Sequence, residues 1–355
     1  MESTTVMTVA TPTIDYWSYY GSQTPPEPCD RSAENIFGAY LSTLYYIVFF
    51  FSVFGNILVL VIIHRFERLT TVTNILLLNL VLSSLIFVSS LPFLAVYQQL
   101  TNWIFGDAMC KIVGSVYYLG FYSSVLFLTL LTFDRHLAVV YSLGAPRMRN
   151  RRYAIISCGA VWLVSGLASM KEMLLHSADV NPIDNNTYCQ DNGRNLYSVH
   201  VDRLRESGFY IQLFLFLIFP LVVVTYCYVR IVITVLSSKI VTKFKTVRLI
   251  FCIVLLFFVC WTPYNVALLL QYQAPKQEGG NCEDLARMSY TLHFTRNLTY
   301  IYFCISPIFY TFVGKKFQNY FRLMLVKRFP SLKKHVSVSH HSATNMSTKS
   351  TGNGL

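Results

Sequence analysis

The segment 39–63 reads AYLSTLYYIVFFFSVFGNILVLVII and contains no charged residue. A helix needs about 20 mainly apolar residues to cross the hydrocarbon core of a membrane. Six further runs of this kind follow, at about residues 72–97, 109–140, 153–174, 207–236, 244–271 and 289–313. The sequence therefore predicts an all-α membrane protein, a seven-transmembrane-helix bundle with a short amphipathic helix after the seventh span.

The composition agrees with a membrane protein. Only 13% of the 355 residues are charged, whereas soluble domains carry about 25%. Prolines occur inside the runs, at Pro92, Pro220, Pro263 and Pro307, and neighbouring helices of a bundle can satisfy the carbonyls that these prolines leave free. A soluble helical protein would need amphipathic runs, which the sequence lacks, so we set that class aside.

The chain divides into four parts. Residues 1–38 are predicted to be an extracellular N-terminal tail, and residues 39–313 the seven-helix bundle. Residues 314–326 are predicted to form an amphipathic helix on the membrane surface, apolar at Phe317, Phe321 and Met324. Residues 327–355 are rich in Ser and Thr and are predicted to be a disordered cytoplasmic tail.

The charges differ between the two sides. If residues 1–38 lie outside, the cytoplasmic side receives 20 of the 29 Lys and Arg but only two of the 17 acids. This bias predicts a multi-pass protein of the plasma membrane with its N-terminus outside. A net charge of +12 is also typical of nucleic-acid binding, but no nucleic-acid motif occurs. The basic residues lie where anionic lipid and a cytoplasmic partner would be, so we expect membrane lipids and no nucleic acid as partners.

Four of the nine cysteines are expected outside the membrane, at Cys29, at Cys110 where the third run opens, at Cys189 and at Cys282. An even number in an oxidising compartment predicts two disulfides, and sequence alone leaves three connectivities open. A Cys110–Cys189 bridge would hold the loop after the fourth run over the mouth of the bundle. Cys29 and Cys282 precede the first and seventh runs, which would be neighbours if the bundle closes.

The outer loop that contains Cys189 also holds a glycosylation sequon. Asn185, Asn186 and Thr187 form this sequon, so Asn185 is predicted to carry a glycan. The sequons at Asn297 and Asn345 lie in a predicted helix and on the inner side, and are chance matches.

Asp134-Arg135-His136 ends the third run. A charged pair at this depth is costly unless partnered, so it is either functional or a snorkelling interfacial pair. The triplet resembles the Asp-Arg-Tyr motif of rhodopsin-like G-protein-coupled receptors, in which Asp134 would hold Arg135 and release it toward a partner. Motifs of the same superfamily occur in order: Gly55-Asn56, Trp103 ahead of Cys110, Pro220 with Tyr228, Cys260-Trp261-Thr262-Pro263-Tyr264 and Ser306-Pro307-Ile308-Phe309-Tyr310.

Within this superfamily, several strings resemble the chemokine receptors. They are Ser90-Leu91-Pro92, Trp103 to Gly106, Gly120 to Arg135 and Phe312 to Phe317, together with the Cys29 and Cys282 pair. Thr246 to Phe251 and Arg296-Asn297-Leu298 are most similar to the XC-type receptor for lymphotactin, whereas CC-type receptors usually have Glu at the Arg296 position. The resemblance implies a receptor that couples a small chemokine outside to a heterotrimeric G protein of the inhibitory class, arrestin and receptor kinases inside.

The resemblance also implies the ligand-binding residues. A basic chemokine would meet acid and tyrosine in the outer tail, at Tyr16, Glu27 and Asp30, with Tyr16 a candidate for sulfation. The inner pocket would comprise Tyr45, Tyr117, Tyr264 and Arg296, although tyrosines at such positions are more often core packing. We expect Arg296 to be the only charge well inside a span, and such a residue is functional by default. A cation there would repel a ligand's amino terminus, so we expect its partner to be either a carboxylate or an inner acidic neighbour.

The same resemblance assigns a conformational switch. Trp261 would lie below the pocket, with Pro263 as the bend that signals helix movement. Tyr228 and Tyr310 would swing toward Arg135 when the cytoplasmic end opens. The Ser and Thr residues of the tail would be phosphorylated for arrestin recruitment.

Some positions depart from the family pattern. Ser84 stands where Asp is usual and Ser306 where Asn is usual, so we expect no sodium site in the bundle, and no other metal or cofactor. Gly120 occupies a position that is often polar, and His136 replaces a tyrosine. These departures leave open a scavenging receptor with weak G-protein coupling. A transporter, channel or enzyme would need acids or a catalytic constellation inside the bundle, which we do not find.

Overall fold

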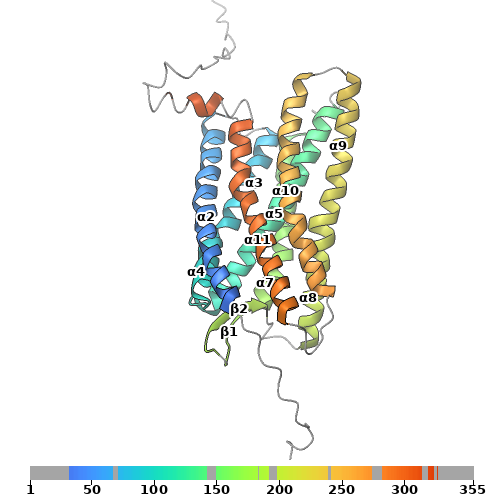
Figure 1. The fold of residues 1–355 in the computed structure, drawn as a ribbon. Helices are drawn as coiled ribbons and strands as arrows, with labels where there is room; N and C mark the ends of the chain where they lie inside the picture. Colours follow the sequence, from blue (N-terminus) through green and yellow to red (C-terminus); the bar gives the residue numbers. More distant parts are fainter. Residues whose placement is uncertain are drawn as a thin grey trace, which may run out of the picture.

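The computed structural model describes residues 32–66, 71–141, 149–182, 184–191, 198–238, 241–273, 282–313, 319–323 and 326. Long helices run side by side through the molecule, and a β-hairpin lies at one end (Figure 1). The elements are α2 (Ser32–Phe66), α3 (Val72–Ser89), α4 (Leu91–Leu100), α5 (Gly106–Val140), α7 (Arg151–Leu175), β1 (His176–Val180), β2 (Thr187–Asp191), α8 (Ser198–Leu213), the π-helix η1 (Phe214–Ile218), α9 (Phe219–Ser238), α10 (Val241–Gln273) and α11 (Cys282–Val313).

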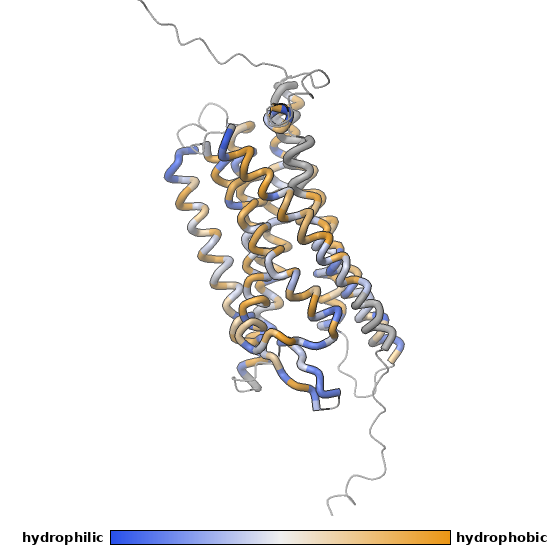
Figure 2. Tube along the Cα trace, turned by 90° about the vertical axis from the view of Figure 1, so that its left-hand side faces the viewer, coloured by the Kyte–Doolittle hydropathy of each residue, from blue (hydrophilic) through white to orange (hydrophobic). Residues whose placement is uncertain are grey.

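Six segments of the described chain are long and apolar enough to cross a membrane, and their bounds are Tyr40–Arg65, Val72–Leu100, Gly106–Val140, Arg151–Leu175, His200–Ser237 and Val254–Gln273. The seventh helix, α11, packs between α2 and α10 and closes the bundle. It is more polar than the others because it carries His293, Arg296 and Asn297. Hydrophilic residues gather toward the two ends of the bundle (Figure 2). The predicted all-α seven-helix fold is confirmed.

The helices extend beyond the apolar runs that predict them. The helix α2 begins at Ser32, inside the segment predicted to be the extracellular tail, and α11 begins at Cys282 rather than near residue 289. A helix of 35 residues is about 50 Å long, whereas the hydrocarbon core is about 30 Å thick. Apolar runs therefore mark the part of a helix inside the lipid, and polar turns continue it into water.

Three prolines lie inside described helices, and the helix geometry changes beside two of them. The second span breaks at Ser90, whose hydroxyl donates to the carbonyl of Phe87 at 2.7 Å. The helix α4 begins at the next residue, Leu91, with Pro92 in its first turn. The π-helix η1 ends at Ile218, two residues before Pro220, which has no N–H to donate to the preceding turn. Pro263 lies inside α10 without ending it. The bundle thus tolerates prolines as the sequence indicates.

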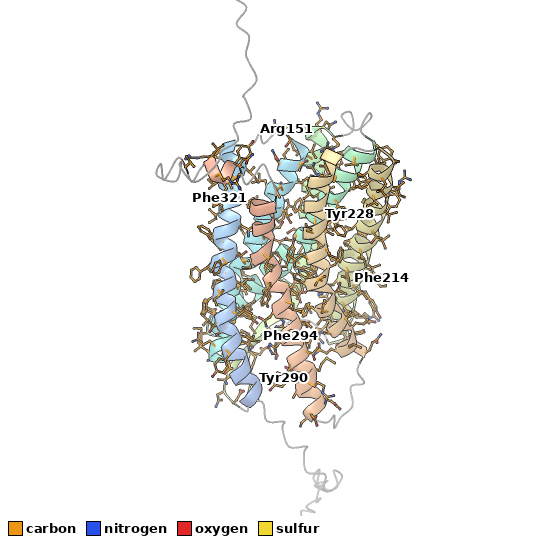
Figure 3. The ribbon with its side chains drawn as sticks, turned by 45° about the horizontal axis from the view of Figure 1, so that its top comes forward. Arg151, Phe214, Tyr228, Tyr290, Phe294 and Phe321 are labelled. Atoms are coloured by element: carbon orange, nitrogen blue, oxygen red, sulfur yellow. A yellow bond between two sulfur atoms is a disulfide. The ribbon has the colours of Figure 1, made fainter. Side chains whose placement is uncertain are left out.

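The two ends of the bundle carry different features. We call the end with β1, β2 and the first turns of α2 and α11 the hairpin end, and the opposite end, with Asp134, Arg135 and Arg149, the Arg135 end. Arg151 and Phe321 lie at the Arg135 end, and Tyr290 lies toward the hairpin end (Figure 3). Residues 319–323 are helical and lie across the Arg135 end beside α2, within the predicted surface helix.

Candidate functional site

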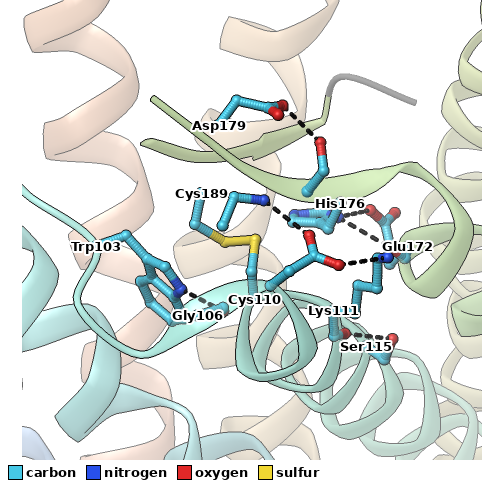
Figure 4. Close-up of a disulfide and its surroundings, with 12 residues drawn as sticks. Trp103, Gly106, Cys110, Lys111, Ser115, Glu172, His176, Asp179 and Cys189 are labelled. Atoms are coloured by element: carbon cyan, nitrogen blue, oxygen red, sulfur yellow. Dashed lines mark hydrogen bonds and ion pairs between the residues drawn. A yellow bond between two sulfur atoms is a disulfide. The ribbon is translucent and has the colours of Figure 1, made fainter. Parts of the chain in front are cut away.

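The β-hairpin is fastened to the start of α5. A disulfide joins Cys110 on α5 to Cys189 on β2 (Figure 4), as predicted. The indole N–H of Trp103 donates to the carbonyl of Gly106 at 2.8 Å, and its backbone N–H donates to the carbonyl of Thr187 at 2.8 Å. Covalent and backbone bonds together hold the hairpin over the ends of the helices.

Charged groups fix the other sides of the hairpin. Asp107 accepts a hydrogen bond from the backbone N–H of Ala178 at 3.0 Å. Arg205 on α8 donates to the carboxylate of Asp191 at 3.1 Å and to its carbonyl at 2.7 Å. Cys282 is also disulfide-bonded, and its predicted partner Cys29 lies outside the described residues. The hairpin is therefore held from α5 and α8 as well as through the disulfide.

The predicted glycosylation site lies at the turn of the hairpin. Asn185 is exposed and has φ of 56°, a left-handed conformation that asparagine adopts more readily than most residues. Close by, the Tyr188 hydroxyl donates to Asp184 at 2.6 Å and lowers the pKa of that carboxyl. The contact stabilises the turn while Asp184 is ionised, at pH values above the ordinary pKa of aspartate. This stabilisation is lost as the pH falls through the lowered pKa and the carboxylate is protonated. The side chain of Asn185 is thus available at the hairpin end.

A cavity of about 240 Å³ lies beneath the hairpin. Tyr45 from α2, Tyr117 from α5, Tyr264 from α10 and Arg296 from α11 all line it, so four helices bring the four predicted inner residues together. The other described lining residues are Leu94, Tyr97, Gln98, Val113, Gly114, Tyr118, His176, Cys189 and Tyr300. Their role in ligand binding stays a prediction.

Arg296 dominates the electrostatics of this cavity. Six of the described lining residues are tyrosines, and none of the described lining residues is acidic. The buried Nε of Arg296 has no hydrogen-bond partner among the residues that the structure describes. A guanidinium in this surrounding attracts an anionic group and repels an amine.

Sequence reasoning missed a second buried charge near the cavity. Glu172, near the end of α7, is 2% exposed, and its carboxylate lies 2.6 Å from Lys171 Nζ and 3.2 Å from His176 Nδ1 (Figure 4). Because Glu172 lies in the last turn of α7, it is a buried charge at the end of a span, whereas Arg296 lies well inside one. The i,i+4 spacing of Glu172 and His176 was the available signal, because such residues share a helix face.

An aromatic cluster continues from the cavity into the middle of the bundle. The ring of Tyr117 lies 4.8 Å from that of Phe87, which stacks on Phe303 at 3.8 Å. Trp261 is 1% exposed and stacks on Phe121 at 3.8 Å, and its ring lies edge-on to Phe87 at 6.2 Å. The predicted switch tryptophan is thus connected by ring contacts to the predicted pocket.

Asp134 has a different main partner from the one predicted. Its carboxylate is fully buried and accepts from Arg149 Nε at 2.7 Å and Arg149 Nη2 at 2.9 Å. The Thr73 hydroxyl donates to it at 3.0 Å. Arg135 Nη2 is 3.9 Å from the same carboxylate and donates to the Thr73 hydroxyl. Arg149 rather than Arg135 therefore holds Asp134 here.

The remaining predicted residues divide into two groups. Tyr228 is buried on α9, with its ring edge-on to Phe251 at 5.0 Å, and lies toward the Arg135 end (Figure 3). Ser84 is buried and donates to the carbonyl of Leu80 at 3.0 Å. The second group has side chains outside the part of the chain that the structure describes, and its members are Tyr16, Glu27, Asp30, Ser306 and Tyr310.

Comparison with known proteins agrees with this architecture. Residues 55–310 match the family model "7 transmembrane receptor (rhodopsin family)". Human C-C chemokine receptor type 1 is 36% identical over 313 residues, which cover 87% of this chain and 85% of the relative. Human C-C chemokine receptor type 4 is 34% identical over 88% of this chain and 86% of its own. G-protein coupled receptor E1 of Equine herpesvirus 2 (strain 86/87) is 35% identical over 82% and 76% respectively. The chain therefore belongs to the rhodopsin family of seven-transmembrane receptors and, within it, to the chemokine receptors.

Proposed function

We propose that this chain is a signalling receptor for a chemokine of the XC type and that it acts through a heterotrimeric G protein of the inhibitory class. The observation that carries the proposal is the position of Arg296 in a tyrosine-lined cavity with no acidic residue among its described lining. The Glu that CC-type receptors usually have at this position would attract an amine. Arg296 inverts this preference, so the ligand differs in chemistry from a CC-type chemokine.

The outer surface suits a basic protein ligand. With the N-terminus outside, this side carries 15 of the 17 acids and nine of the 29 Lys and Arg. Tyr16, Glu27 and Asp30 contribute to this charge, and sulfation of Tyr16 would increase it. Opposite charge speeds and orients the encounter of two proteins. The ligand body would therefore bind the acidic exterior, while its leading segment enters the cavity and presents an acidic group to Arg296.

The aromatic cluster provides a route for the signal. A ligand group that displaces Tyr117 would move Phe87, and through it Trp261, because these rings are in contact. Pro263, two residues after Trp261, interrupts the hydrogen bonding of α10 and permits this helix to bend. The bend would open the Arg135 end, where Arg135, Tyr228 and Tyr310 receive the G protein. The basic inner surface would contact anionic lipids, and the phosphorylated tail would recruit arrestin through receptor kinases.

The test measures calcium and cAMP in cells that express the chain, with an XC-type chemokine and a panel of CC-type chemokines. We expect a response to the XC-type ligand that a toxin against the inhibitory G-protein class abolishes. Arg296→Gln should weaken this response by about tenfold or more, because an ion pair inside the cavity is lost. Arg287→Gln is the matched control, since Arg287 lies on the same helix, is 72% exposed and pairs with Glu283.

Two outcomes would contradict the proposal. The first is a response to CC-type chemokines that is unchanged in the Arg296→Gln variant. It would contradict both the XC-type ligand and the proposed role of Arg296. Ligand internalisation and arrestin recruitment with no G-protein response would favour the scavenging receptor, the alternative to which Ser84 and His136 point. His136 is 3% exposed and neither ring nitrogen has a hydrogen-bond partner among the described residues.

A further inference from the structure

Arg149 binds the carboxylate of Asp134, the group that the family motif pairs with Arg135. Its guanidinium makes a two-bond fork with Asp134, at 2.7 Å to Oδ1 and 2.9 Å to Oδ2. Two parallel bonds of this kind are the strongest geometry that Arg and a carboxylate form. Arg135 approaches the same carboxylate only to 3.9 Å. Nothing in the family motif assigns a role to Arg149.

The local sequence explains why Arg149 reaches this position. Asn150 caps α7, because its side-chain oxygen accepts from the backbone N–H of Tyr153 at 2.7 Å. Arg149 immediately precedes this cap, and α7 packs against both α5 and α3. The cap therefore directs Arg149 toward the end of α5. Arg151 and Arg152 lie in the first turn of α7 and are exposed, with Arg151 at the rim of the Arg135 end (Figure 3).

Thr73 completes the arrangement. Its hydroxyl donates to Asp134 Oδ2 at 3.0 Å and accepts from Arg135. Three of the roughly four acceptor positions of the carboxylate are then taken by Arg149 and Thr73. The Nε of Arg135 is buried and has no hydrogen-bond partner among the described residues. Arg135 thus hydrogen-bonds to a neutral hydroxyl, and its ion pair with Asp134 is the longer contact, at 3.9 Å.

We propose that Arg149 is a positioning residue for coupling: by occupying Asp134, it keeps Arg135 available to the G protein. Without Arg149, Asp134 would be a buried carboxylate next to one remaining cation, and it would capture Arg135. The inference rests on the proposed coupling through Arg135. It predicts that loss of Arg149 lowers signalling, whereas loss of Asp134 raises it.

The first test is an epistasis measurement of basal and chemokine-stimulated G-protein activation, normalised to receptor at the cell surface. Arg149→Gln should lower basal activation by about fivefold. Asp134→Asn should raise it, and the double variant should match Asp134→Asn alone, because Arg149 acts only through Asp134. Arg149→Lys should restore part of the activity, since it retains the charge without the fork. Arg151→Gln is the matched control and should change nothing.

If Arg149→Gln lowers activation by the same factor in the Asp134→Asn background, Arg149 contacts the partner directly and the inference is wrong.

A second test needs no G protein. In purified receptor, a double-mutant cycle of Asp134→Asn and Arg135→Gln is read as shifts in Tm, with and without Arg149→Gln. The coupling between Asp134 and Arg135 should increase when Arg149 is replaced, and an unchanged coupling would overturn the inference. A receptor that activates no G protein would contradict the proposed function while this cycle still decides the role of Arg149.

Discussion

Gly120 determines how closely α5 and α3 approach each other. A Cβ atom at this residue would lie 2.5 Å from the backbone nitrogen of Phe87 and 2.6 Å from its Cα. A backbone atom cannot move aside as a flexible side chain can. The sequence marks Gly120 only as a departure from the family pattern, and the structure supplies the physical reason for a glycine there.

Gly120→Ala should destabilise the receptor by about 1–3 kcal/mol, the usual cost of overpacking a tight core. The measurement is the thermal unfolding of purified receptor together with the amount at the cell surface. Gly166→Ala is the control, because a Cβ there would meet no atom within 4 Å. Equal unfolding temperatures for the two variants would contradict the close packing of α3 and α5.

Glu172 is the other residue whose role follows from its contacts. Glu172→Gln would leave Lys171 without its charged partner and weaken the bond to His176, which lines the cavity. We expect a loss of about 1–3 kcal/mol and a weaker response to ligand. Glu283→Gln provides the control, since Glu283 is 74% exposed. An unchanged Tm for Glu172→Gln would show that the buried pair contributes nothing to the hairpin end.

At the scale of elements, the hairpin depends on its fastenings. The strands β1 and β2 have five residues each, and within the described part of the chain they pair with one another alone, from His176–Asp191 to Val180–Thr187. An isolated two-stranded hairpin is marginally stable in water. The disulfide, Trp103 and Arg205 therefore decide whether the hairpin covers the cavity.

Replacing Cys110 and Cys189 together by Ser should destabilise the receptor, because the bridge spans 79 residues. From the loop-closure entropy of the unfolded chain, we expect the free energy of unfolding to fall by about 4–5 kcal/mol. The checks are Tm and chemokine binding, and both should fall. Cys304→Ser is the control, as Cys304 is a free thiol. Retained binding in the double variant would mean that the hairpin holds its position without the bridge.

The whole molecule is a multi-pass plasma-membrane protein whose two ends differ in charge. The predicted sidedness can be tested through Asn185, which is exposed at the hairpin turn. Glycosidase treatment should shift the mobility of the receptor on a gel, and Asn185→Gln should abolish this shift. Asn297→Gln is the control, because Asn297 is 4% exposed and donates to the carbonyl of His293.

A glycan at Asn185 would place the hairpin end outside the cell. Epitope tags at residues 2 and 355 should then be detected on opposite sides of the plasma membrane. Tags on one side would require an even number of crossings, which contradicts the seven-helix bundle. The assignment of the acidic side to the outside and the basic side to the cytoplasm would then fail as well.

The sequence by itself determined the class of fold, the order of the membrane spans and the family motifs. Each span is recognisable alone, because transfer of an apolar run into lipid does not depend on the other runs. The order of the spans places Cys110 and Cys189 at the same end of the bundle, but it leaves the connectivity of the four outer cysteines open. The structure shows that these two are joined.

Only the tertiary structure decided which buried polar groups meet. The hydrogen bond from Arg149 to Asp134 joins residues that are 15 positions apart in the sequence. The hydrogen bond from Ser52 to the carbonyl of Phe303 joins residues 251 positions apart. The π-helix η1, which precedes Pro220, brings Phe216 to stack on Tyr122 at 3.9 Å. Such contacts depend on the rotation and crossing of whole helices, which an apolar run leaves open because lipid accepts any of its faces. The partner of Asp134 and the pairing of Glu172 were therefore decided by helix packing.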